Sequence, residues 1–183
     1  MAGETEKFIL RAIRDGDRVN KFQVAREDDA LRAFLKKSAL QFSASNIAKT
    51  YVAIQSDGAE QPLVRSYISI LLSEIKKEYA ATEDCPEANR YNFPAVKIAR
   101  LATDKNFEGK GLGSGLIALV AGLVREHVMP HAGCRFLILD ANRVKIDFYK
   151  KRGFVLVDNE ENLRAENQNP VMFMDLHKIE DAK

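Results

Sequence analysis

Cysteine is scarce in this 183-residue chain, and no long hydrophobic run occurs in it. The two cysteines, Cys85 and Cys134, do not form a disulfide framework, so they favour a reducing compartment and predict a cytoplasmic protein. No apolar stretch approaches the roughly 20 residues of a membrane-spanning helix. The acidic start of the chain also lacks the apolar core of a secretory signal. We therefore expect no membrane partner.

The chain also lacks a strong excess of either charge. Its formal net charge of +2 is too small to indicate a nucleic-acid partner by itself. The three histidines, His127, His131 and His177, have no metal-ligand spacing with the cysteines, and we expect no metal site. Internal repeats and low-complexity tracts are absent as well. Residues 1–183 are therefore expected to form a single domain.

Hydrophobic periodicity and turn residues predict a mixed α/β protein. Strands are expected at 18–24, 50–55, 63–75, 95–103, 135–139, 154–157 and 171–176, and helices at 28–47, 111–127 and 144–151. Turn residues at 56–59 predict an antiparallel hairpin between the second and third strands. The charged, irregular segment 76–94 is a candidate loop on the substrate side.

The most informative stretch is the glycine-rich run at 107–115, Phe-Glu-Gly-Lys-Gly-Leu-Gly-Ser-Gly, between a predicted strand and a predicted helix. Glycines let the backbone approach a ligand closely, and the N–H groups that open a helix attract phosphate. The spacing fits neither common nucleotide motif. Asp104 stands where a Walker loop needs glycine, and Ser114 or Leu116 stands where a dinucleotide fingerprint needs one. From the residues alone, a phosphate-binding loop and a bare turn both stay open.

Residues 99–117 resemble the acyl-CoA-binding motif of the GNAT acyltransferase superfamily, Arg/Gln-x-x-Gly-x-Gly/Ala after a strand. Gly111 and Gly113 take the glycine positions, whereas Glu108 stands where arginine or glutamine is usual. We expect Glu108 to face solvent and Lys110 to compensate its charge. A second stretch, 139–154, is similar to the late Asn…Phe-Tyr…Gly-Phe motif of the same superfamily. The resemblance covers an acyl-CoA-binding core at 95–157.

This resemblance implies a single GNAT domain, with a mixed, mostly antiparallel sheet that is flanked by helices and splayed between its fourth and fifth strands. It also implies acetyl-CoA as the cosubstrate. Backbone N–H groups of the loop would bind the pyrophosphate, and the preceding strand would pair with the pantetheine arm. The implied cofactor-binding residues are Leu101, Ala102, Thr103, Glu108, Gly109, Lys110, Gly111, Leu112, Gly113, Ser114, Asn142 and Phe148.

Tyr149 matches the tyrosine that protonates the departing thiolate in this superfamily, with core packing against Phe148 as the alternative. Asn142 is expected either to bond the pantetheine arm or to cap the following helix. No general base is identifiable. Acidic side chains near the region that flanks the substrate cleft in relatives are Glu74, Glu78, Glu83 and Asp84.

Three functions stay open at this point. The first is acetyl transfer from acetyl-CoA to a primary amine of a small molecule or a protein. The second follows from segments 22–39 and 49–54, which resemble GNAT toxins of toxin–antitoxin pairs that acetylate the α-amine of aminoacyl-tRNA. It implies tRNA and an antitoxin as partners, with interspersed basic residues such as Arg11, Lys97 and Arg100 available for phosphates. The third is a non-catalytic acyl-CoA sensor, and a homodimer is also open.

Overall fold

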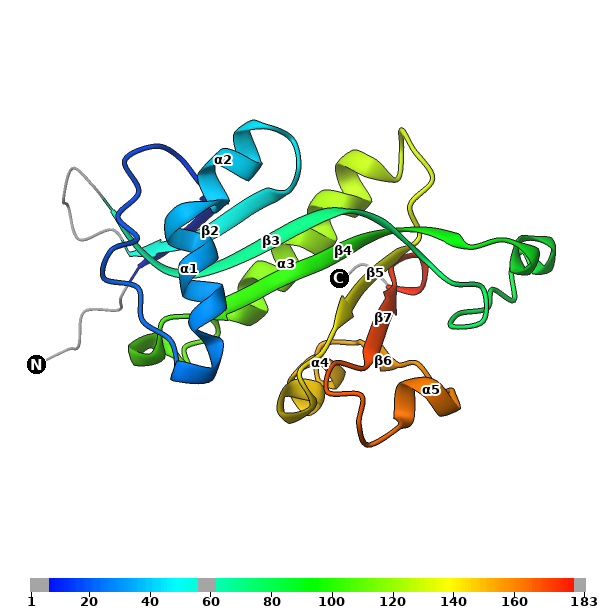
Figure 1. Ribbon diagram of the computed structural model, residues 1–183. Helices are drawn as coiled ribbons and strands as arrows, with labels where there is room; N and C mark the ends of the chain where they lie inside the picture. The colour runs from blue at the N-terminus through cyan, green and yellow to red at the C-terminus, as the bar shows by residue number, and fades with distance from the viewer. Residues whose placement is uncertain (1–6, 56–61, 180–183) are drawn as a thin grey trace, which may run out of the picture. The chain divides into compact units, whose positions relative to one another are not determined.

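The computed structural model describes residues 7–55 and 62–179, which divide into two compact units (Figure 1). Of the described residues, unit 1 comprises those up to residue 71 together with 100–120, and unit 2 comprises 72–99 together with 121–179. Two long strands, β3 (Leu63–Ile75) and β4 (Phe93–Thr103), contribute residues to both units. The turn expected at 56–59 lies outside the described residues.

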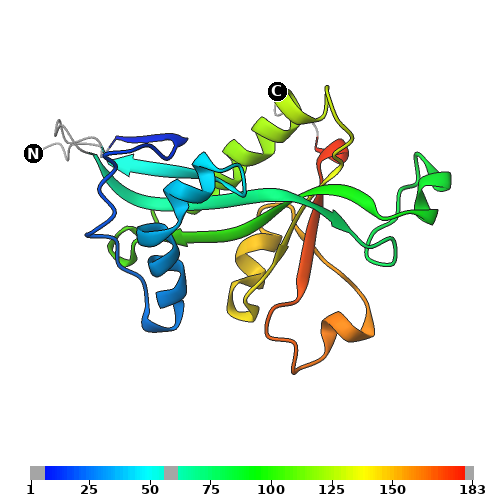
Figure 2. The same ribbon diagram turned by 45° about the horizontal axis from the view of Figure 1, so that its top comes forward.

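In unit 1, β1 (Phe8–Ala12), β2 (Lys49–Gln55) and β3 pair antiparallel, which confirms the expected hairpin between β2 and β3. Two helices, α1 (Asp29–Lys37) and α2 (Ala39–Ala44), cover one face of β2 and β3 (Figures 1 and 2). The start of α3 (Leu112–Leu123) lies on the other face, as Figure 2 shows.

Tyr67 of β3 is central to the core of unit 1. Its side chain is fully buried, its ring stacks on Phe34 of α1, and Phe22 meets it edge-on. The hydroxyl donates a hydrogen bond of 2.8 Å to the carbonyl of Leu31. Burial raises the pKa of Tyr67 above the usual value of a tyrosine. The helix pair is therefore fixed to the sheet by aromatic packing and by one buried polar contact.

Unit 2 contains paired strands of its own. β4 pairs parallel with β5 (Phe136–Asp140), β5 pairs antiparallel with β7 (Val171–Asp175), and β7 pairs antiparallel with β6 (Val155–Leu156). The two remaining helices are α4 (Ile146–Lys150) and α5 (Glu160–Leu163). The strand order β1-β2-β3-β4-β5-β7-β6 confirms the expected mixed, mostly antiparallel sheet. The β4–β5 register covers only Ala95 to Ile98 of β4, which continues to Thr103, as expected where a sheet opens between these strands.

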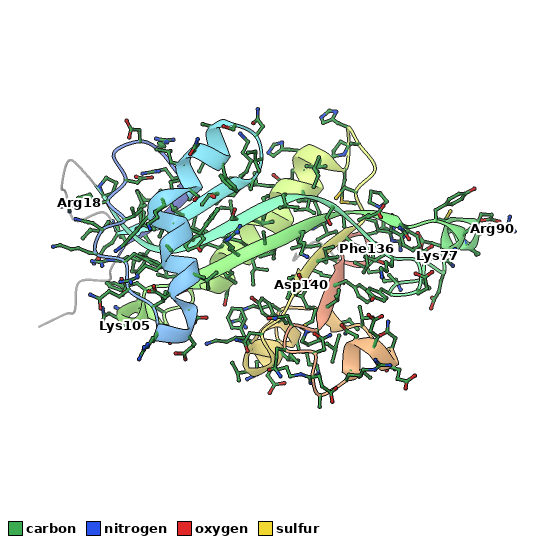
Figure 3. All side chains as sticks on the ribbon, viewed as in Figure 1. Arg18, Lys77, Arg90, Lys105, Phe136 and Asp140 are labelled. Atoms are coloured by element: carbon green, nitrogen blue, oxygen red, sulfur yellow. The ribbon has the colours of Figure 1, made fainter. Side chains whose placement is uncertain are left out.

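The interior of unit 2 is aromatic. The ring of Phe136, labelled in Figure 3, meets Phe93 and Phe173 edge-on, at centroid distances of 5.3 and 5.7 Å. Such edge-on pairs stabilise a core beyond the area that they bury. Beside them, Arg135, the residue before β5, donates to the carboxylates of Asp84 and of Asp175 in β7, so ion pairs connect the irregular segment 76–92 to the start of β5 and the end of β7.

Several expected elements differ from those observed. Segment 18–24 is not a strand: it forms one isolated bridge, from Arg18 to Leu63, and Phe22 turns fully into the core from a loop. The first strand is instead β1. The helix expected at 28–47 breaks at Ser38, whose φ of −129° is not helical. The helix expected at 111–127 changes at Val124 into a π-helical turn that runs to Val128.

Replacing Tyr67 tests the buried contact in unit 1. Tyr67→Phe leaves the Leu31 carbonyl without its donor and should lower the free energy of unfolding by about 1–2 kcal/mol. Tyr67→Ala also removes the ring and should cost about 3–5 kcal/mol. The exposed Tyr91→Phe is the matched control, with a change within about 0.5 kcal/mol. Urea denaturation measures all three, and a Tyr67→Phe protein as stable as the wild type would contradict the assignment.

Candidate functional site

The glycine-rich run forms the connection from β4 to α3 in unit 1. A short 3-10 turn at Lys105–Phe107 comes first, and Gly109 and Gly111 then take φ values of +78° and +79°. The carbonyl of Gly111 accepts the first α3 hydrogen bond, from the N–H of Gly115 at 2.9 Å. Residues with a side chain rarely adopt such φ values, so this turn depends on glycine.

The start of α3 has the geometry of an anion site. The N–H groups of Leu112 and Gly113 lie in the first turn, where a helix supplies no acceptor for them. The positive end of the helix dipole adds to their attraction for phosphate. A Cβ placed on Gly109 or Gly111 would meet no atom within 4 Å, so the surface above the turn is open to a ligand. These features suit an anionic group, and binding of the CoA pyrophosphate here stays a prediction.

Charged side chains surround this loop. Glu108 and Lys110 are both exposed, as is Lys105, labelled in Figure 3. The Phe107 ring carries two cations: the guanidinium carbon of Arg65 lies 4.2 Å from its centroid, and the amine of Lys110 lies 4.6 Å from it. Glu108 therefore faces solvent, as the sequence predicts. The loop has cations close by, although the residue at the motif position is acidic.

The end of β4 supplies the expected pantetheine-binding residues Leu101, Ala102 and Thr103. Ala102 is buried in the core of unit 1, and its carbonyl accepts a 2.9 Å hydrogen bond from the hydroxyl of Ser66. The Thr103 hydroxyl lies 2.9 Å from the same Ser66 oxygen. Since β5 pairs with β4 only as far as Ile98, the last five residues of β4 extend beyond the ladder with β5.

The late motif lies in unit 2. Asn142 caps the 3-10 turn that precedes α4, because its Oδ1 accepts the N–H of Val144 at 3.2 Å. Tyr149 on α4 is half-buried, with its ring edge-on to Phe148 and Phe154 at 5.1 and 5.7 Å. Both local alternatives from the sequence, capping by Asn142 and packing of Tyr149, are therefore present. Their roles toward a cofactor stay predictions.

Phe148 is engaged within its own unit. The guanidinium carbon of Arg152 lies 3.5 Å from the Phe148 ring centroid, and Arg152 also donates to the Phe148 carbonyl. Gly153, with a φ of +85°, then turns the chain from α4 into β6. The Phe-Tyr pair is thus held in place from the C-terminal end of α4.

Among the candidate general bases, Asp84 is a poor choice. Hydrogen bonds from Arg135 lower the pKa of Asp84 to about 2, so this carboxylate stays ionised and is a weak base near neutral pH. Glu74 accepts a hydrogen bond of 2.9 Å from Asn92. The segment itself is ordered by Thr82 and Asn89, which bond to each other, and it carries Lys77 and Arg90, labelled in Figure 3.

Three basic residues considered for phosphate binding are engaged internally. Arg11 forms a bidentate ion pair with Asp17, with a shortest distance of 2.5 Å. Lys97 pairs with Asp140 at 2.6 Å, at the end of β5. The guanidinium carbon of Arg100 lies 3.8 Å from the Phe34 ring centroid. These contacts argue against a continuous basic surface in which all three residues bind tRNA phosphates.

One important residue had no role in the expected site. Asp104 is fully buried, and its carboxylate accepts the N–H groups of Gln23 and Asn106 at 3.2 and 3.0 Å. An aspartate at the start of a turn is a recognisable capping signal. Its burial depends on Gln23, which is 81 positions away in sequence, and could not be read from the local motif.

Comparison with known proteins identifies the type of fold. Residues 73–154 match the Acetyltransferase (GNAT) family. A tyrosine-to-phenylalanine mutant of KacT is similar over 94% of this chain and 96% of its own, with 22% identity and a TM-score of 0.80. AtaT complexed with acetyl-methionyl-tRNAfMet is similar over 93% and 96%, with 21% identity and a TM-score of 0.77. AtaTR bound with acetyl-CoA is similar over 93% and 94%, with 24% identity and a TM-score of 0.69.

Substitution at Gly111 tests the anion site. Gly111→Ala strains a φ of +79° and should weaken acetyl-CoA binding on the order of 10-fold, the equivalent of about 1–2 kcal/mol of left-handed strain. The control is Gly122→Ala within α3, where an added Cβ meets nothing within 4 Å and alanine favours the helix. Isothermal titration calorimetry measures both affinities. Equal affinity in the two variants would mean that the phosphate site lies elsewhere.

The Asp84–Arg135 ion pair predicts a pH window. The pKa of Asp84 is lowered in the folded state from 3.8 to about 2, so its stabilising effect is present above pH 4 and is lost as the pH falls toward 2. Wild type should melt at a higher temperature than Asp84→Asn at pH 5–7, and the difference should shrink as the pH falls through 2. Glu87→Gln, in the same segment, is the control at pH 7. A difference that persists unchanged at pH 2 would contradict this prediction.

Proposed function

We propose that this chain is a GNAT-type acetyltransferase, as the match at 73–154 and the similarity to KacT support, and that it transfers the acetyl group of acetyl-CoA to the α-amine of an aminoacyl-tRNA. The observation that carries the proposal is the extent of the structural similarity. It covers 93% of this chain for AtaT complexed with acetyl-methionyl-tRNAfMet, and so reaches well beyond the family match at 73–154. Both compact units therefore take part in the similarity.

The chemistry of the acceptor supports the same choice. The amine of an aminoacyl ester has a lower pKa than a lysine side chain, so a useful fraction is neutral near pH 7 without a strong base. Asp84, with a pKa of about 2, does not provide such a base. A site that receives an amine already neutral needs mainly to orient it and to protonate the leaving group.

Residues of this chain then have separate roles. The N–H groups at 109–114 and the α3 dipole bind the pyrophosphate, and residues 101–103 of β4 align the pantetheine arm. Acetyl-CoA supplies the activated thioester. As the amine nitrogen bonds to the acetyl carbon, the carbon–sulfur bond breaks, and Tyr149 gives its phenolic proton to the departing thiolate. The amine proton passes to solvent, and the tyrosine is reprotonated from it.

The proposal has consequences for location and partners. As part of this proposal, the reaction takes place in the cytoplasm. Within the described residues, no helix is long and apolar enough to cross a membrane. Structures of KacTA with DNA and of AtaT with the C-terminus of the antitoxin AtaR make an antitoxin the expected protein partner. We further propose that residues 1–183 act as a single domain, and a homodimer stays an open alternative to a monomer.

A second candidate is acetylation of a small-molecule or protein amine. The internal contacts of Arg11, Lys97 and Arg100 favour it, because each of these cations already has a partner within the chain. A non-catalytic acyl-CoA sensor is favoured only by Glu108 at the motif position.

Acetyl transfer from radiolabelled acetyl-CoA separates these functions. The acceptors are bulk aminoacylated tRNA, deacylated tRNA, and a panel of polyamines, amino acids and lysine peptides. Label on charged tRNA alone supports the tRNA reaction. Label on a small amine or peptide, with charged tRNA inert, establishes the second candidate. Binding of acetyl-CoA without transfer to any acceptor supports the sensor.

Tyr149→Phe tests the general acid. Loss of the phenolic proton should lower kcat by about 10²–10⁴ while acetyl-CoA affinity stays near that of the wild type. The control is Tyr91→Phe, which removes an exposed hydroxyl from the same unit and should leave kcat unchanged. Steady-state kinetics measure kcat, and a titration of acetyl-CoA measures its affinity. If Tyr149→Phe keeps the wild-type kcat, Tyr149 is not the general acid, and packing against Phe148 is its remaining role.

A further inference from the structure

In the loop at the start of α3, glycine occupies both positions with positive φ, so no side chain restricts the backbone at these two positions. Contacts from neighbouring residues therefore matter for its conformation. Two side chains connect this loop to β3 and to segment 20–23 within unit 1. One is Asp104, through its buried carboxylate, and the other is Phe107, through its ring.

Asp104 connects three segments. Its two carboxylate oxygens accept three N–H donors: Oδ1 accepts the backbone and side-chain N–H groups of Asn106, at 3.0 and 3.1 Å, and Oδ2 accepts the N–H of Gln23 at 3.2 Å. Its own N–H donates to the carbonyl of Arg65 on β3 at 2.7 Å, and its carbonyl accepts the N–H of Phe107 at 2.7 Å. The adjoining N–H of Lys105 donates to the carbonyl of Gln23 at 2.8 Å.

A carboxylate is the group that this position requires. The side chain is fully buried and all three donors are neutral N–H groups, so both oxygens must act as acceptors. An asparagine offers one acceptor oxygen and would turn an NH₂ group toward an N–H that needs an acceptor. Burial without full hydrogen bonding is costly, so the contact to Gln23 or to Asn106 would be lost.

Phe107 is the second contact. Its ring meets Phe8 of β1 edge-on at 6.0 Å, and the guanidinium carbon of Arg65 lies 4.2 Å from its centroid. Arg65 is held in turn by Gln55 of β2, whose Oε1 accepts its Nε–H at 2.9 Å. The residue before Glu108 is thus packed against β1 and β3, while Glu108 itself is exposed.

We propose that Asp104 and Phe107 are positioning residues for the phosphates of CoA. They hold the loop from the side of the sheet, so that the N–H groups at 109–114 point at the ligand before it arrives. The inference rests on the proposed function, since it takes the ligand to be acetyl-CoA. It also explains how the loop tolerates Glu108 at the motif position: binding depends on prearranged backbone N–H groups rather than on that side chain.

The test compares two ligands in three variants. Acetyl-CoA carries the phosphates, and S-acetyl-pantetheine lacks them. Asp104→Asn should weaken acetyl-CoA binding by roughly 10-fold to 100-fold and leave S-acetyl-pantetheine binding unchanged. Phe107→Leu should weaken acetyl-CoA binding by about 3-fold to 10-fold and leave S-acetyl-pantetheine binding unchanged. Tyr67→Phe is the matched control, because it also loses a buried hydrogen bond in unit 1 and should bind both ligands as the wild type does.

Calorimetry and NMR titration measure the two affinities, at a temperature where circular dichroism shows each variant folded. If Asp104→Asn does not fold, Phe107→Leu decides the question by the same comparison. Unchanged acetyl-CoA affinity, or equal weakening for both ligands, would overturn the inference while leaving the proposed function intact. A wild-type protein that binds no acetyl-CoA would overturn the proposed function and the inference with it.

Discussion

The buried carboxylate of Asp104 is the constraint on which the candidate cofactor site depends. An ionised group without solvent costs several kcal/mol unless its oxygens are hydrogen bonded. In this chain the donors come from segment 20–23 and from the turn at Asn106, while the backbone of Asp104 itself bonds to β3. The carboxylate thus requires three segments to meet at the end of β4. The glycine turn at 109–111 therefore follows a backbone segment whose position the hydrogen bonds of Asp104 determine.

Much of the proposed chemistry is carried by the backbone. The first-turn N–H groups of α3 attract an anion whatever the neighbouring side chains are, and the positive φ values depend only on Gly109 and Gly111. This division explains why the sequence departs from the superfamily at Glu108 without losing the geometry of the loop. The side chains that matter for the loop lie behind it, at Asp104, Phe107 and Arg65, and they stabilise it from within unit 1.

The sequence predicts elements well where an apolar pattern is long. The strand expected at 63–75 has the bounds that the structure gives to β3, and the strand at 95–103 differs from β4 only at its start. The pattern fails where apolar residues enter the core from a loop. Val19, Phe22 and Val24 pack into unit 1, although their segment forms a single β-bridge. The five-residue β1 was missed because so short a run has no distinctive period.

The candidate site shows the same limit. Motif spacing identifies the glycine turn, because its conformational requirement is local to Gly109 and Gly111. The role of Asp104 depends on a partner 81 positions away, and the loss of Asp84 as a base depends on Arg135, 51 positions away. Such contacts exist only after the chain has folded, and a single sequence gives no sign of them.

The last five residues of β4 have a further consequence. Their ladder with β5 has ended, so within the described residues β5 does not pair with this part of the strand. Unprotected strand edges recruit other strands and promote aggregation. A pantetheine arm laid along the strand would cover this part of it, and at 100 times its Kd the ligand would add about 2.7 kcal/mol to the stability of the fold. Binding of the cosubstrate would then stabilise the fold as well as supply the reaction.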